Sequence, residues 1–459
     1  MNSDKYSLAE FFCGCGGTSR GFTRSGRFNV VFGNDVKHEA LQTFEFNHAQ
    51  DDIPPSIVNR DIRLLDIETI HSALQQRGVA RGDLDVMIGG PPCQGFSQLR
   101  RNEVREKGKI VKFAGYSQLA EDPRNDLVLR YLEVAEALQP KFLVIENVPQ
   151  MLNHGFEGRL GKLSETVIRM LEKDLGYKVE VAVLNCADYG VPQLRERAIF
   201  IASSVGPASM PSKSHGDPKD AKLMNSGLKP WVTVSDAISD LPTPPLNEDK
   251  LGGGSLDLYG KEASDFARSM RNAKSFPYNH VTRTYKQQVL NIIKEMRPGQ
   301  TWDSESARMR DQYHRVISEK AEAEQISFEL AKINLTESGL INPVFYKNYY
   351  WSAYSRLAWD FPALTITANA NFLGSGRFTH PEEMRGITMR EAARLQSFDD
   401  DFRFVTSAAD PNDGARIGVG MDMIGEAVPP NLSQAIAEHL ASQLDARAST
   451  TNSATKNIA

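Results

Sequence analysis

The sequence predicts an α/β fold with a doubly wound, mostly parallel sheet, followed by a second, smaller domain. Three observations predict this fold. Short apolar runs alternate with helical patterns over the first 205 residues, a glycine-rich turn directly follows the first run, and polar residues end several later runs. Alternating strands and helices favour a parallel sheet, and ligands bind such folds at the carboxyl ends of the strands.

Six apolar runs are predicted to be strands, and four segments between them have apolar residues at helical spacing. The strands are 6–12, 28–34, 84–90, 141–148, 177–185 and 197–202, and the helices are 36–48, 64–77, 125–138 and 160–175. A further strand region is expected before Asp61. Beyond residue 205, loops rich in Pro, Gly and Ser interrupt the chain, and helices are predicted over 316–335, from 388 and over 431–444.

These patterns predict two domains and a tail. We expect 1–205 and 420–445 to form the first domain and 206–419 to form the second. The small, polar segment 446–459 is predicted to be disordered.

The composition is typical of globular proteins, with 41% hydrophobic and 24% charged residues in 459. No apolar run approaches the 18 residues of a membrane span. The amino terminus has no basic start followed by an apolar core, so we expect no secretory signal. Four Cys without a C-x-x-C pair argue against a structural zinc site and favour free thiols in a reducing cytosol.

The net charge of −5 argues weakly against nucleic acid, but basic residues cluster locally. Residues 98–113 carry six Lys or Arg against two Glu, and 268–315 carry ten against four acidic residues. The second stretch is interleaved with Phe276, Tyr278, Tyr285, Trp302 and Tyr313. Basic residues with aromatics suit a phosphate backbone. For either stretch alone, an ordinary solvated surface is the competing interpretation.

The first predicted strand runs into a glycine cluster, Phe12 to Gly17, that would let a ligand approach the backbone closely. Asp35 ends the second strand, where a carboxylate can hydrogen-bond ribose hydroxyls. Asp61 and Ile62 follow the next strand region and could touch an adenine. The G-x-G-x-x-G form is missing, which favours a nucleoside cofactor over a dinucleotide. The competing interpretation is a glycine turn with a helix-capping Asp.

Cys93 lies where the strand 84–90 ends, within the segment GGPPCQGFS. Pro91 and Pro92 restrict the backbone before it and so hold its sulfur in place. A thiol of ordinary pKa is roughly one-tenth thiolate near pH 7.5, and the thiolate is a strong nucleophile. Most lone Cys are small buried hydrophobes, but the Pro-Pro dipeptide and the polar loop that follows favour a reactive role here.

Two further segments bring charge to the same half of the chain. Glu146 leaves the apolar strand 141–148 at its carboxyl end. In an extended chain Gln193, Arg195 and Arg197 share one face, which aims an amide and two guanidinium groups at an acceptor-rich or anionic partner.

Taken together, the segments resemble the DNA cytosine carbon-5 methyltransferase family, in the family's order, over about residues 6–445. The matching segments are the Phe-x-Gly-x-Gly-Gly turn at 12–17, PPCQGFS at 91–97, ENV at 146–148, QLRER at 193–197, REAARLQSF at 390–398 and GEAVPP at 425–430. Segments 231–242, 278–283 and 355–367 resemble the flanks of the target-recognition region in bacterial members. The resemblance implies a Rossmann-like class I methyltransferase domain and a smaller target-recognition domain.

The resemblance implies S-adenosylmethionine as the cofactor and no metal. It places these residues at the cofactor: Phe12, Gly14, Cys15, Gly16, Gly17, Asp35, Val36, Asp61, Ile62, Gly90, Pro92, Leu127, Glu426 and Ala427. It places Cys93 at the nucleophile, Glu146 at the carboxylate that holds the target base, and Arg195 and Arg197 at phosphate and base contacts. It also implies DNA contacts by Gln94, Ser97, Arg100, Arg101 and Gln193.

The resemblance implies a reaction in which the Cys93 thiolate adds to ring carbon 6 of a flipped-out cytosine, after which carbon 5 takes the methyl group. We expect a cytoplasmic, nucleoid-associated monomer that acts on duplex DNA, with no membrane partner. A cognate restriction endonuclease or other defence-system protein is a possible partner. The DNA sequence that the protein recognises does not follow from its own sequence.

One position departs from the family pattern, because Glu426 replaces the usual Asn of the C-terminal motif. A catalytically impaired DNA-binding relative is therefore an alternative, although Cys93, Glu146 and Arg197 are all present. A tRNA cytosine methyltransferase is a second alternative. It is disfavoured because the recognition region is long and has no Cys-Phe-Thr element.

Overall fold

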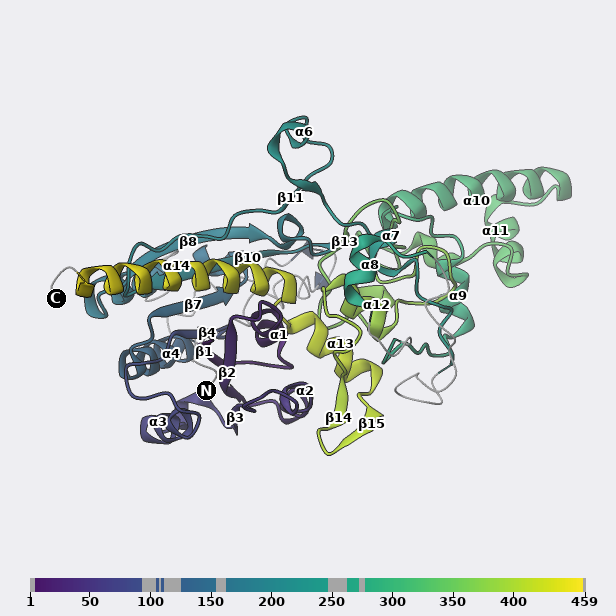
Figure 1. Ribbon diagram of the computed structural model, residues 1–459. Helices are drawn as coiled ribbons and strands as arrows, with labels where there is room; N and C mark the ends of the chain where they lie inside the picture. The colour runs from purple at the N-terminus through teal and green to yellow at the C-terminus, as the bar shows by residue number, and fades with distance from the viewer. Residues whose placement is uncertain are drawn as a thin grey trace. The chain divides into compact units, whose positions relative to one another are not determined.

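The structure is a computed structural model that describes residues 5–92, 105–106, 109–110, 125–153, 162–246, 262–271 and 277–456. The chain forms two compact units (Figure 1). The first unit comprises Met1–Trp231, Val405–Pro411 and Ala427–Ala459, and the second comprises Val232–Phe404 and Asn412–Glu426.

The first unit is built on a seven-stranded sheet with the strand order β3-β2-β1-β4-β7-β10-β8. Its strands are β1 (Tyr6–Phe11), β2 (Phe28–Asp35), β3 (Ser56–Asn59), β4 (Val86–Gly89), β7 (Phe142–Asn147), β8 (Lys178–Asn185) and β10 (Glu196–Ser203). The first five strands along the order, β3 to β7, pair in parallel, whereas β10 is antiparallel to both β7 and β8. The predicted α/β class and all six predicted strands are confirmed.

Helices cover both faces of this sheet. Successive side chains of a strand point to opposite faces, so neighbouring residues of one strand pack against different helices. Ala9 packs in one hydrophobic core with residues of α3 (Ile67–Gln76), α4 (Asn125–Leu138) and α5 (Lys162–Arg169). Leu8, its neighbour, packs in the other core with residues of α1 (Gly17–Arg24), α2 (His38–His48) and α14 (Pro430–Lys456). The helices α1 and α14 lie side by side in Figure 1.

The second unit is mainly helical. Its helices are α7 (Val234–Ile238), α8 (Asp265–Met270), α9 (Gln287–Ile293), α10 (Trp302–Glu324), α11 (Phe328–Glu337), α12 (Met389–Leu395) and α13 (Ile417–Glu426). Arg394 on α12 is fully buried and pairs with Asp240 at 2.7 Å and with Asp400 at 2.6 Å. This buried ion-pair cluster joins the end of α7 to the loop after α12.

Short elements complete the chain. They are β5 (Arg105–Glu106), β6 (Lys109–Ile110), β9 (Gln193–Leu194), β11 (His215–Gly216), β12 (Lys229–Pro230), β13 (Ala363–Leu364), β14 (Val405–Ser407), β15 (Asp410–Gly414) and α6 (Leu223–Ser226). Among them are the 3-10 helices Ile62–Leu64, Pro149–Asn153, Cys186–Tyr189, Pro343–Tyr346 and Leu373–Ser375, and one π-helical turn, Met170–Asp174. Among the described residues, no helix combines the length and apolar character needed to cross a membrane.

The units divide at different residues from those predicted. Residues 206–231 belong to the first unit because Asp188 anchors them. The Asp188 carboxylate accepts a hydrogen bond from Trp231 Nε1 at 2.9 Å and pairs with Lys213 Nζ at 2.6 Å. Residues 405–411 also join the first unit, whereas 420–426 belong to the second.

The C-terminal segment also differs from its prediction. Helix α14 continues to Lys456, whereas the sequence favoured disorder from residue 446. The helix is anchored by buried residues from Leu432 to Leu444. Once the buried part of the helix has formed, adding a further residue costs little free energy, because each added residue contributes its own hydrogen bond.

Candidate active site

The turn after β1 has a backbone that requires glycine. Gly14 has φ +52° and Gly16 has φ +96°, in the left-handed region that side chains rarely adopt. A Cβ atom at Gly16 would lie 3.0 Å from both Phe44 and Ser19, so the turn is tightly packed from below. A Cβ atom at Gly14 would meet nothing within 4 Å. The turn therefore presents an open backbone surface at the carboxyl edge of the sheet.

Asp35 lies beside this turn at the end of β2. Its carboxylate accepts hydrogen bonds from the backbone N–H groups of Gly14 and Lys37, each at 2.8 Å. Burial raises the pKa of Asp35, and these two backbone donors oppose the shift. The next side chain, Val36, is 66% exposed although it is apolar. A carboxylate next to an exposed apolar side chain suits the ribose and the flat base of a nucleoside.

Asp61 and Ile62 follow β3. Asp61 caps the short helix Ile62–Leu64 by accepting from the Arg63 backbone N–H at 2.9 Å, and the Arg63 side chain lowers the pKa of Asp61. The Ile62 side chain is buried in the core, and its carbonyl accepts a hydrogen bond from Arg130 Nε at 3.2 Å. Leu127 is half-buried and packs against the same core.

The segment that leads to Cys93 is tied to β7. A Cβ atom at Gly90 would lie 3.0 Å from the Glu146 carboxylate, so these residues are in close contact. Asn147 donates a hydrogen bond from Nδ2 to the Pro91 carbonyl at 2.8 Å. Pro92 is half-buried and is the last described residue before the gap. Cys93, Gln94, Ser97, Arg100 and Arg101 lie outside the described residues.

Glu146 and Arg197 form the charged pair of the site. Arg197 Nε lies 2.7 Å from Glu146 Oε1, and the two side chains are only 12% and 15% exposed. The antiparallel register of β10 and β7, in which Ile199 pairs with Glu146, brings Arg197 to the end of β7. Arg197 also donates from Nη1 to the Glu196 carbonyl at 2.7 Å. These contacts hold the Glu146 carboxylate in one orientation beside Gly90.

Gln193 and Arg195 are buried instead of facing solvent. Gln193 and Arg195 are interior, Leu194 and Arg197 are half-buried, and Glu196 is exposed. Arg195 is 1% exposed and donates to the Ala427 carbonyl at 3.2 Å. Burial, followed by the nearby Arg197, lowers the pKa of Arg195 to about 9. In this structure Arg195 therefore supports the site from inside the protein.

The last predicted cofactor positions lie in different units. Ala427 is half-buried in the first unit, where its carbonyl receives Arg195. Glu426 is the last residue of α13 in the second unit, and it is exposed.

Sequence reasoning missed Glu10, a buried carboxylate on β1. Its side chain accepts a hydrogen bond from the Ser19 backbone N–H at 3.1 Å. Burial raises the pKa of Glu10 to about 8. The available signal was an acidic residue inside the otherwise apolar run YSLAEF, two residues before Phe12.

In the second unit, three of the five aromatic residues of the basic stretch 268–315 are not available to a nucleic-acid surface, whereas Tyr285 is half-buried. Tyr278, Trp302 and Tyr313 are at most 6% exposed and belong to the hydrophobic core, so this part of the prediction is wrong. Phe276 lies outside the described residues. Arg297 and Arg308 both pair with the buried Glu305. Among the described residues of this unit, the exposed aromatic residues are instead Tyr346, Tyr349, Tyr350, Trp351 and Phe372, which the sequence did not single out.

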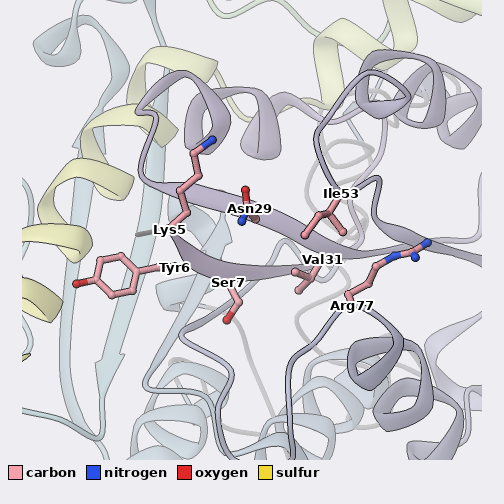
Figure 2. A pocket seen from close by; sticks show the side chains of 7 residues that line it. All are labelled: Lys5, Tyr6, Ser7, Asn29, Val31, Ile53 and Arg77. Atoms are coloured by element: carbon pink, nitrogen blue, oxygen red, sulfur yellow. The ribbon is translucent and has the colours of Figure 1, made fainter. Parts of the chain in front are cut away.

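A small cavity in the first unit lies away from this site and does not contribute to it. A cavity of about 10 Å³ lies at the amino-terminal ends of β1 and β2, where Lys5, Ser7, Asn29 and Arg77 contribute to its lining (Figure 2). It is therefore at the opposite edge of the sheet from the glycine turn. Within the described part of the chain, no three His, Cys, Asp or Glu side chains are grouped to hold a metal ion.

Comparison with known proteins decides the family. A family model described as C-5 cytosine-specific DNA methylase matches residues 6–442. The chain belongs to this family. The resemblance inferred from the motifs is thus confirmed, and the protein is an enzyme of the DNA (cytosine-5)-methyltransferase class.

Individual relatives of this methyltransferase extend over almost its whole length. It is 31% identical to the type II methyltransferase M.AgeI of Thalassovita gelatinovora, over 94% of this chain and 97% of that protein. It is 28% identical to the type II methyltransferase M.DdeI of Desulfomicrobium norvegicum, over 95% and 88%. A solved prophage-encoded protein of E. coli, described as a DNA modification methyltransferase, has the same fold. That structure has a TM-score of 0.62 at 20% identity and covers 96% of this chain and all of the solved chain.

Proposed function

We propose that this methyltransferase transfers a methyl group from S-adenosylmethionine to carbon 5 of a flipped-out cytosine in duplex DNA, through a covalent adduct of Cys93. The observation that carries the proposal is the Glu146–Arg197 pair, held at 2.7 Å beside Gly90. This places an oriented carboxylate next to the segment that leads, three residues later, to the only Cys that a Pro-Pro dipeptide precedes.

The glycine turn and the end of β2 would hold S-adenosylmethionine. The open backbone at Gly14, the Asp35 carboxylate and the exposed Val36 fit a nucleoside. Phe12, with φ +54°, lies in the same turn and is half-buried. When bound, this cofactor supplies a methyl group on a sulfonium centre.

The chemistry requires an activated ring, because carbon 5 of cytosine is a weak nucleophile. The Cys93 thiolate forms a bond to carbon 6, and the electron pair of the 5,6 double bond becomes available at carbon 5. The Glu146 carboxylate is proposed to hold ring nitrogen 3 and the exocyclic amine, and Arg197 to hold the ring carbonyl. Carbon 5 would then bond to the methyl group that the cofactor supplies, while the methyl–sulfur bond breaks and its electron pair remains on sulfur as a neutral thioether. Loss of the carbon 5 proton to a base and departure of the Cys93 thiolate restore the double bond.

The target base must leave the duplex, at a cost of a few kcal/mol. We assign the closing and phosphate contacts to residues 94–116, from their basic, Gly-punctuated sequence. In the second unit, the exposed Tyr349, Tyr350 and Trp351 near Lys347 in sequence support a further DNA contact. The type II relatives support a role in restriction–modification, with a cognate endonuclease as partner.

The test is methyl transfer to duplex DNA of mixed sequence, with bisulfite sequencing of DNA from expressing cells to read the target site. Cys93→Ser should abolish turnover and keep duplex binding. Cys186→Ala is the matched control, because Cys186 is buried in the core, where burial raises its pKa to about 11. DNA with 5-fluorocytosine at the target should trap a covalent adduct with wild type and not with Cys93→Ser. Turnover above a few per cent in Cys93→Ser would contradict the covalent route.

An inactive DNA-binding relative is the alternative. Its one sequence argument was Glu426, and the exposure of this side chain removes the need for a buried unpaired carboxylate. The methyl-transfer assay separates the two functions, since the relative would bind duplex DNA without modifying it.

A further inference from the structure

A chain of buried polar side chains lies directly below the glycine turn. His48 is the last residue of α2, and its Nδ1 atom lies 2.6 Å from the Asp51 carboxylate. Its Nε2 atom lies 2.9 Å from the Ser19 hydroxyl on α1. The Ser19 hydroxyl is in turn 3.1 Å from the Gly16 carbonyl. Ser19 is fully buried and His48 is 3% exposed, so the contacts of Ser19 with His48 and Gly16 are shielded from water, whereas Asp51 is partly exposed.

Glu10 joins this chain from β1. Gly16 precedes α1 and has no side chain to cap the helix. The Glu10 carboxylate takes that role, because it accepts the Ser19 backbone N–H in the first turn of the helix. One residue, Ser19, is thus held through its backbone by β1 and through its hydroxyl by α2.

The Ser19 hydroxyl has one proton and three neighbours that could accept it, namely His48 Nε2, the Gly16 carbonyl and the Glu10 carboxyl group. If His48 Nε2 carries a proton, it donates to Ser19 Oγ, and the hydroxyl proton is left for the Gly16 carbonyl or the Glu10 carboxyl group. If His48 Nε2 accepts instead, the hydroxyl proton goes to His48 and the Gly16 carbonyl loses this donor. The Asp51 carboxylate lies at the other ring nitrogen, Nδ1, so the imidazole ring links Asp51 to Ser19.

The apolar side of α2 acts on the same turn. Phe44 lies one helical turn before His48, with ring centroids 4.5 Å apart. A Cβ atom added at Gly33 would lie 2.7 Å from the Phe44 ring, and one at Gly16 would lie 3.0 Å from it. The Phe44 ring therefore packs closely against Gly16, the same residue whose carbonyl lies 3.1 Å from the Ser19 hydroxyl. Gly16 is two residues from Gly14, whose backbone N–H donates to Asp35 at 2.8 Å.

We propose that Asp51, His48 and Ser19, together with Glu10, are positioning residues that hold the Gly14–Gly17 turn in the shape that binds S-adenosylmethionine. The proposal rests on the proposed function, in which this turn contacts the cofactor. None of the four residues reaches the reacting atoms. They act through the Gly16 carbonyl and the first turn of α1, so they should affect cofactor affinity and leave DNA binding and the chemical step unchanged.

The experiment compares two substitutions of one residue. In His48→Gln the amide nitrogen can reach the place of Nε2 and still donate to Ser19, whereas the shorter side chain of His48→Asn ends near Nδ1. A neutral hydrogen bond contributes about 1 kcal/mol, which corresponds to roughly a fivefold change in affinity. We expect His48→Asn and Ser19→Ala each to raise KM and Kd for S-adenosylmethionine about fivefold to tenfold. His48→Gln should stay within about twofold of wild type, and kcat should be unchanged in all three.

The double variant Ser19→Ala/His48→Asn should bind the cofactor no worse than Ser19→Ala alone, because both remove the same link. His71→Asn, on α3 in the same unit, is the matched control and should leave KM and Kd unchanged. If His48→Asn does not fold, Ser19→Ala decides, since it removes a single oxygen atom. An unchanged Kd in Ser19→Ala, or a loss of kcat at constant Kd, overturns the proposal for these residues. If wild type does not bind S-adenosylmethionine, the proposed function fails together with it.

Discussion

Replacing Arg197 by Gln should slow methyl transfer about 10- to 150-fold. Arg197 Nε lies 2.7 Å from Glu146 Oε1, and both side chains are largely buried. A hydrogen bond to a charged group contributes about 1.5–3 kcal/mol, and about 1.4 kcal/mol corresponds to a factor of ten in rate. Gln keeps one donor but loses the charge and the geometry of the guanidinium group, so the Glu146 carboxylate is free to turn away from the target base.

The assay is single-turnover transfer of tritiated methyl from S-adenosylmethionine to saturating duplex DNA that contains the target site. Cofactor affinity is measured alongside by calorimetry and should not change. Arg169→Gln is the matched control, because Arg169 pairs with Asp174 at 3.3 Å on the exposed surface, where ion pairs contribute little. If Arg197→Gln keeps more than about one-third of the wild-type rate, the pair does not orient the catalytic carboxylate, and the reasoning fails.

Three further predictions concern DNA, the cofactor and pH. Replacing Arg100, Arg101 and Lys107 together by Ala should flatten the dependence of duplex affinity on salt, by about 0.9 in log–log slope for each phosphate that the loop no longer neutralises; an unchanged slope in fluorescence anisotropy would show that this loop does not touch DNA. Glu426→Asn should bind S-adenosylmethionine as wild type does, since Glu426 is exposed; a calorimetric gain of tenfold or more would contradict this. The contribution of Glu10 to the stability of the wild type should fall between about pH 5 and 8, because burial raises the pKa of Glu10 to about 8 and the folded state then keeps a proton that the unfolded chain has lost. Denaturant unfolding should show a smaller decline for Glu10→Gln, and parallel curves for the two proteins would contradict the assignment.

Local sequence was enough to predict most elements of the first unit. Apolar runs such as FLVIEN in β7 are buried on both faces, and their length and composition favour strands. The antiparallel direction of β10 was not predictable in the same way. RAIFIA is buried whichever way its neighbours run, so direction is decided by the connection between β7, β8 and β10.

The boundaries of the units and the surface of the second unit were harder to predict. A Pro/Gly/Ser-rich loop after residue 205 marks an exposed connection, but Asp188 decides which unit it joins. Trp302 and Tyr313 alternate with basic residues in the way a nucleic-acid surface does, yet both are core residues of the α10 region. On a helix, aromatic residues can face the core while the basic residues between them face the opposite side. The same sequence pattern therefore fits both a core helix and a nucleic-acid surface.

The sequence by itself determined the family, the candidate nucleophile Cys93 and the order of the motifs, because the chemistry of each motif is carried by residues close together in the chain. Only the tertiary structure decided which charges meet. Arg197 reaches Glu146 because β10 runs antiparallel to β7, and Ser19 meets His48 because α1 and α2 pack on the same face of the sheet. Arg195 and Glu10 are likewise buried by elements that pack around them in the tertiary structure. Whether a polar side chain is buried and paired depends on the elements that pack around it, and residues distant in sequence supply those elements.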